Sequence, residues 1–129
     1  MQPSAELRDL LLRYYAAMSD GDIADIECLV DHEALAIGTD PAEWLSGAEL
    51  WSVFRAQLAQ LGGRLPVTAG EPLAYADGTA GWAADRPVFD IPGVGEIPVR
   101  LSVVFHRGEK GWRIVHTHAS VGLPNDAPG

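Results

Sequence analysis

The chain has 129 residues, of which 47% are hydrophobic and 21% charged, and its mean hydropathy is +0.03. This length predicts a single domain over residues 1–129, with a core over about residues 5–123 and a loose C-terminal tail. The net charge of −9 disfavours nucleic acid and anionic membranes as partners. Charged residues among the N-terminal leucines and the lack of a long apolar run favour a cytoplasmic protein.

Helical patterns occupy the N-terminal part of the chain. An apolar stripe at spacings of three and four predicts a first helix over residues 4–19. The stripe consists of Leu7, Leu11, Tyr14 and Met18. Asp22 is a favourable N-cap for a second helix over residues 23–30. The apolar residues 34–38 predict a short strand, and a capping box at residues 46–49 predicts the start of a third helix.

Strand patterns account for the rest of the chain. They predict four long strands joined by glycine-containing hairpin turns, at about residues 64–77, 79–90, 96–107 and 112–123. Prolines interrupt all but the last of these strands, which favours bulges, bends or edge positions. Helices at one end of the chain and hairpins at the other predict an α+β fold, with the helices packed into the concave side of a curled sheet.

The last predicted strand carries two histidines two positions apart. Strict alternation along a strand places one set of side chains on one face, namely Trp112, Ile114, His116, His118 and Ser120. Both faces are largely apolar, so the two imidazoles are expected to line a pocket. A His-x-His pair needs a third ligand to hold a metal ion, and the spacing of His32 and His106 does not supply one. We therefore expect no metal site.

Three local motifs follow one another along the chain. They are Tyr14-Tyr15-Ala16-Ala17 before Gly21-Asp22, Ile37-Gly38-Thr39-Asp40-Pro41 with Trp44 and Gly47, and Trp112-Arg113-Ile114-Val115-His116 with His118 and Ser120. Together with the element order, they resemble the SnoaL-like branch of the NTF2-like superfamily, which is related to the ketosteroid isomerases. The resemblance implies an α+β cone, with three N-terminal helices packed in a strongly curved, mainly antiparallel sheet. It also implies a small hydrophobic molecule bound inside the cone and a homodimer through the outer sheet face.

Three residues are candidates for proton transfer. His118 or His116 could act as a general base, or each could simply hydrogen-bond within the core. Asp40 lies roughly where the isomerase relatives carry their catalytic base, but an aspartate before a proline also caps turns.

Tyr14 could stabilise an enolate, as a tyrosine of the first helix does in those isomerases, with Tyr15 as the alternative. The alternative for Tyr14 is a purely packing role. Ketosteroid isomerases also use a protonated carboxylic acid on a late strand, an arrangement that is a standard example of a raised carboxyl pKa. Residues 99–105 contain no acid, so steroid-type isomerisation is not expected.

A further set of residues is expected to contact the substrate: Trp44, Trp51, Phe54, Tyr15, Trp82, Arg100, Trp112 and Ser120. The aromatic members could equally be core. Arg100, inside a strand pattern, needs a carboxylate partner or an anionic ligand. The resulting hypothesis is a small-molecule-binding protein that acts as a cofactor-free acid/base isomerase, cyclase or lyase on a hydrophobic carbonyl or polyketide-like compound. The alternative is a noncatalytic ligand-binding or dimerisation module.

Overall fold

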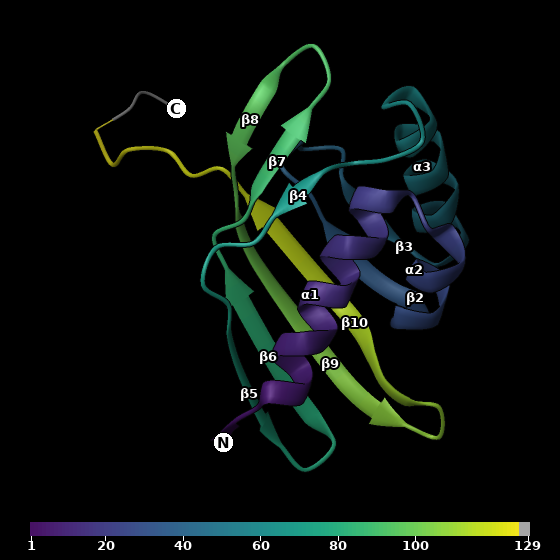
Figure 1. Cartoon of the computed structure of the whole chain (residues 1–129), viewed down its shortest axis with the longest axis vertical. Helices are drawn as coiled ribbons and strands as arrows, with labels where there is room; N and C mark the ends of the chain where they lie inside the picture. The colour runs from purple at the N-terminus through teal and green to yellow at the C-terminus, as the bar shows by residue number, and fades with distance from the viewer. Residues whose placement is uncertain (127–129) are drawn as a thin grey trace.

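The computed structural model describes residues 1–126 and confirms an α+β fold with three helices and a curved, mostly antiparallel sheet (Figure 1). The helices are α1 (Ala5–Asp20), α2 (Ile23–Leu29) and α3 (Gly47–Gln60). The strands are β1 (Gln2–Pro3), β2 (Val30–Ile37), β3 (Trp44–Ser46), β4 (Val67–Thr68), β5 (Leu73–Asp77), β6 (Ala80–Asp85), β7 (Val88–Ile91), β8 (Gly95–Pro98), β9 (Arg100–Gly108) and β10 (Gly111–Ser120). The last three residues of the predicted loose tail lie outside the described part.

The strands form two sheets. A seven-stranded sheet has the order β1-β5-β6-β9-β10-β2-β3, and a three-stranded sheet has the order β4-β7-β8. The sequence patterns predicted longer strands, and the structure divides three of them between the two sheets. The breaks fall at residues 69–72, 86–87 and 99, beside prolines that cannot donate to a ladder. The β7–β8 hairpin consequently extends away from the main sheet at one end of the molecule (Figure 1).

The first helix begins and ends where its sequence dictates. The Ser4 side chain accepts a hydrogen bond from the backbone N–H of Leu7 at 3.1 Å, which satisfies one free donor of the first turn. Gly21 ends the helix in the left-handed conformation at φ 70°, which glycine adopts without steric cost. The helix lies across the concave side of the main sheet and buries Leu7 and Leu11 completely (Figure 1).

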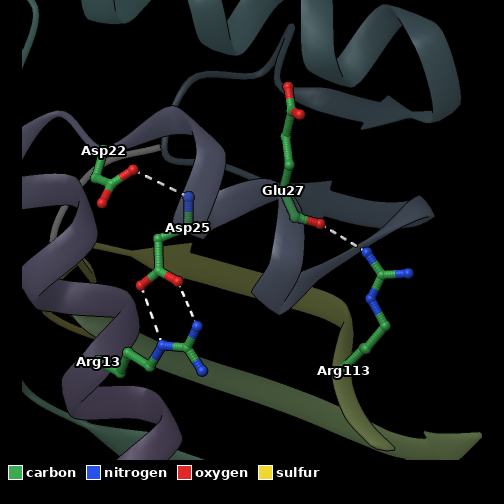
Figure 2. Close-up of polar contacts among 5 residues, drawn as sticks. All are labelled: Arg13, Asp22, Asp25, Glu27 and Arg113. Atoms are coloured by element: carbon green, nitrogen blue, oxygen red, sulfur yellow. Dashed lines mark hydrogen bonds and ion pairs between the residues drawn. The ribbon is translucent and has the colours of Figure 1, made fainter. Parts of the chain in front are cut away.

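The short helix α2 is anchored at both ends by polar contacts, as Figure 2 shows. At its start, Asp22 accepts from the backbone N–H of Asp25 at 3.1 Å, so the predicted N-cap is confirmed. Asp25 also forms an ion pair with Arg13 of α1. At its end, Arg113 of β10 donates to the carbonyl oxygen of Glu27 at 2.6 Å, which satisfies a carbonyl group that the helix leaves free.

The start of α3 differs from the prediction in one detail. Ser46 is the N-cap residue and has an extended backbone, but its side chain makes no capping hydrogen bond. The predicted capping box is therefore wrong.

The two faces of the main sheet differ sharply in burial. In β9, Leu101, Val103 and Phe105 are buried against the helices, whereas the alternating Ser102 and Val104 are exposed. The concave face therefore carries the core, and the register of the neighbouring strands assigns their side chains to the same two faces.

Candidate functional site

A β-bulge in β10 decides where the two histidines lie. Ile114 pairs with Phe105 and His116 pairs with Val104, so Val115 is one extra residue on β10. An extra residue reverses the side-chain alternation beyond it. The prediction that His116, His118 and Ser120 share the face of Ile114 is therefore wrong.

Thr117 continues the concave face beyond the bulge. It belongs to a row of paired positions that crosses the sheet, and the row consists of Ala74, Ala83, Val103, Thr117, Ala36 and Leu45. Ala74, Ala83, Val103 and Leu45 are all buried. Thr117 thus holds the inward position that the sequence pattern gave to the histidines.

Both histidines lie on the convex face. His116 is half-buried, and its Nδ1 lies 2.8 Å from the carbonyl oxygen of Leu35 on the neighbouring strand. His118 is exposed, and its ring centroid lies 6.5 Å from that of His116. A general base in this position would face away from the interior of the cone.

The interior of the cone holds a cavity of about 40 Å³, which is space on the scale of a single water molecule. Its lining consists of Tyr14, Ile26, Val30, Ala34, Ala36, Leu50, Trp51, Phe54 and Thr117. Burial raises the pKa of Tyr14 to about 12. The Trp51 indole N–H donates to the carbonyl of His32 at 3.3 Å, which leaves the hydroxyls of Tyr14 and Thr117 as the polar groups for a ligand here.

A buried tyrosine–aspartate pair lies elsewhere in the core. The Tyr15 hydroxyl donates to Asp85 Oδ2 at 2.9 Å, and the backbone N–H of Gly70 donates to the same oxygen at 3.1 Å. Burial and this hydrogen bond raise the pKa of Tyr15. Asp85 Oδ1 is buried and has no hydrogen-bond partner among residues 1–126. The sequence carries one signal for this buried acid, because the spacing of Asp85 from Ala83 is that of an inward-facing strand position.

Asp40 occupies the turn that follows β2. Its side chain is exposed and accepts a hydrogen bond from the backbone N–H of Ala42 at 2.8 Å. This is the turn-capping geometry that an Asp-Pro sequence favours. Asp40 does not line the interior cavity.

The remaining predicted site residues divide between the two faces. Trp51 and Phe54 join Tyr14 at the cavity. Trp112 precedes the bulge and lies on the concave side, with the Arg107 guanidinium 5.4 Å from its ring centroid. Trp44, Trp82, Arg100 and Ser120 lie on the convex side with the histidines. The structure therefore does not bring the four predicted catalytic residues together.

Within residues 1–126, no group of three or more His, Cys, Asp or Glu side chains is arranged to hold a metal ion. In the same part of the chain, no helix is both long and apolar enough to cross a bilayer.

The fold has many solved counterparts at low sequence identity. An NTF2-like protein of unknown function from Pseudomonas putida KT2440 has a TM-score of 0.83 at 18% identity, and the match covers 95% of this chain and 88% of that one. The S. rosetta CaMKII hub has a TM-score of 0.75 at 17% identity, over 95% of this chain and 98% of the other. A putative ketosteroid isomerase from Shewanella frigidimarina NCIMB 400 has a TM-score of 0.70 at 17% identity, over 87% and 92%.

These likenesses show an NTF2-like α+β fold. A model of the SnoaL-like domain matches residues 7–124, so the chain belongs to the SnoaL-like domain family, as the sequence motifs predicted. No curated protein is a significant relative in sequence. The family includes isomerases, but proteins that share one fold carry out different activities. The function therefore has to be inferred from the residues of the site.

Proposed function

We propose that this SnoaL-like domain functions as a homodimeric binding module, whose dimer interface is the convex face of the seven-stranded sheet. The carrying observation is a large apolar surface that neither the helices nor the second sheet covers. Trp44 is 66% exposed, Leu73 58%, and Trp82 and Val104 37% each. Exposed apolar surface of this extent is typical of protein interfaces.

The exposed residues belong to two continuous rows of exposed and half-buried residues across the sheet. The first convex row consists of Tyr75, Trp82, Val104, His116, Leu35 and Ser46, and the second of Leu73, Ala84, Ser102, His118, Ile37 and Trp44. The rings of Tyr75 and Trp82 stack with centroids 5.1 Å apart, which gives the first row a rigid aromatic end.

The charge distribution favours a second copy of the chain as the occupant. The chain contains 18 acidic residues, but neither convex row contains a carboxylate. Two chains of charge −9 repel one another over most of their surfaces, and these rows are where that repulsion is weakest. The similarity to a CaMKII hub adds a precedent for assembly on this fold.

The interior cavity supports binding rather than acid/base catalysis. An isomerase or cyclase of the expected kind needs a general base beside its substrate. The nine residues that line the cavity include Tyr14 as their ionisable member, and its raised pKa keeps the hydroxyl protonated at neutral pH. Tyr14 therefore acts as a hydrogen-bond donor, and none of the nine cavity-lining residues can act as the general base.

The dimer is tested by light scattering on a sizing column. We expect wild-type protein at twice the 13.8 kDa chain mass. The double variant Trp82→Glu/Val104→Glu places carboxylates in the first convex row, and we expect about a hundredfold weaker association with circular dichroism unchanged. Val94→Glu is the matched control, because Val94 is 68% exposed in the β7–β8 turn, outside both rows. A monomeric wild type would contradict the proposal.

A small hydrophobic ligand inside the cone is a second candidate function. The apolar lining and the hydroxyls of Tyr14 and Thr117 favour it, although any ligand larger than water requires Trp51 and Phe54 to move outward. Native mass spectrometry of the purified protein would show an added mass. We expect Ala36→Leu, which fills the cavity, to remove that mass, and an unchanged adduct would place the ligand elsewhere.

A further inference from the structure

A second, much larger pocket opens beside the second convex row. Its volume is about 810 Å³, and it lies where β6 ends, β9 begins and β10 ends. The lining consists of Gly70, Glu71, Leu73, Ala84, Asp85, Arg86, Arg100, Leu101, Ser102, His118 and Ser120. This volume is in the range of small-molecule sites, whereas the interior cavity is far below it.

Two arginines of this pocket have no carboxylate partner. The ion pairs within residues 1–126 are Arg13–Asp25 and Arg55–Glu27, and neither involves Arg86 or Arg100. Both side chains are exposed, so their guanidinium groups are accessible to a ligand from solvent. A guanidinium group is a planar donor fork that matches a carboxylate in two parallel hydrogen bonds.

The polar side chains around Arg100 hold it in a defined position. Its Nε donates to Ser120 Oγ at 3.1 Å, and its guanidinium lies against Gly122 so closely that a Cβ there would be 3.1 Å from the Cζ atom. Because Nε is occupied by Ser120, the terminal nitrogens remain as donors for a ligand. Ser102 and His118 lie next to this position on the same face.

We propose that this pocket binds a small organic acid with an apolar body. Arg100 and Arg86 would receive the carboxylate, and Leu73 and Ala84 would contact the apolar part. Glu71 and Asp85 also line the pocket and oppose a dianion more strongly than a monoanion. A monocarboxylate therefore fits this lining better than phosphate does.

All the lining residues belong to one chain, but the pocket borders the proposed dimer interface. Four of them, Leu73, Ala84, Ser102 and His118, are also members of the second convex row. The two arginines lie beyond the two convex rows, and the dimer-breaking substitutions at Trp82 and Val104 are in the first row, which does not line the pocket. Ligand binding by that double variant therefore separates the two proposals.

The test is a titration followed by the backbone amide resonances of Ser102, His118 and Ser120. The probes are hexanoate, its uncharged counterpart hexanamide, and inorganic phosphate. We expect saturable shifts with hexanoate, and at least tenfold weaker binding of hexanamide and phosphate. We expect Arg100→Gln and Arg86→Gln each to weaken hexanoate binding at least tenfold, while Arg8→Gln, an exposed arginine outside the pocket, leaves it unchanged.

Three results would overturn the proposal. Equal binding of hexanoate and hexanamide would show that the carboxylate is not recognised. Tighter binding of phosphate would show that the apolar body is not. Unchanged hexanoate affinity in both arginine variants, with native resonance positions elsewhere, would place the ligand outside this pocket.

Discussion

The two faces of the seven-stranded sheet are built from alternate residues of the same strands, yet only one of them is covered. On the concave face, Val103 is fully buried and Phe105 is 1% exposed, while Val104 between them is 37% exposed. The concave face is filled by the chain's own helices and retains about 40 Å³ of cavity. The convex face carries the histidines and the exposed aromatics. The larger pocket opens at its edge, where Asp85 and Leu101 of the concave side also line it. Both proposed interactions, the dimer interface and the organic-acid pocket, therefore lie on the outside of the cone.

The largest expected effect separates two neighbouring residues of β9. Phe105→Ala removes a ring from the core, and we expect the free energy of unfolding to fall by about 3–5 kcal/mol. Val104→Ala removes methyl groups from the convex face, and in monomeric protein we expect a loss below about 1 kcal/mol. Urea unfolding of both variants, at a protein concentration low enough for the chain to be monomeric, measures the two losses. Similar losses for the two variants would contradict the assignment of faces.

The next effect concerns alkaline pH and Tyr14. Its pKa is about 12 in the folded chain and about 10 when the chain is unfolded, so the folded state holds its proton more tightly. The stabilisation is therefore complete below pH 10 and is lost as pH rises toward 12, by about 3 kcal/mol. Tyr14→Phe removes this pH dependence. The difference in free energy of unfolding between the wild type and the variant should therefore decrease between pH 10 and pH 12. A constant difference between the two would show that Tyr14 is not buried as described.

Much of the fold could be predicted because its signals are local. The stripe of α1, the Asp22 cap and the glycine-containing turns depend on residues close together in the chain, and the element order matched the SnoaL-like pattern. The division of the long strands between two sheets was not predictable in detail. Prolines show that a ladder must break, but which strands then pair is decided by contacts between distant residues.

The predicted face of the β10 histidines was wrong because of a single extra residue, Val115. Residues 112–120 are largely apolar on both faces, so only the pairing with β9 reveals that Val115 is an extra residue. A bulge leaves no clear mark in one strand's sequence when the residues on both sides are apolar. Tyr14, Trp51 and Phe54 line the interior cavity, and their role in binding a substrate stays a prediction.

A smaller effect compares two tyrosines, one on each side of the sheet. Tyr15→Phe removes a donor from the buried Asp85, which keeps the Gly70 N–H, and we expect a loss of about 1–3 kcal/mol. Tyr75→Phe, in the stacked pair on the convex face, is the matched control and should change stability by less than about 0.5 kcal/mol. Thermal unfolding of both variants at neutral pH measures the difference. An equal change would mean that the buried pair has no special role.

The smallest expected effect is also the most direct test of the bulge. Deleting Val115 leaves Ile114 opposite Phe105 and His116 opposite Val104, so every later side chain keeps its face. We expect a folded protein that loses about 1 kcal/mol of stability. Deleting Thr117 is the matched control: it turns His118 inward and Ala119 outward, which places an imidazole in the buried row and should prevent folding. If β10 had no bulge, deleting Val115 would itself reverse the face of all the residues that follow it. An unfolded Val115 deletion variant, seen by circular dichroism, would therefore contradict the bulge and would place the histidines of the intact chain on the concave face.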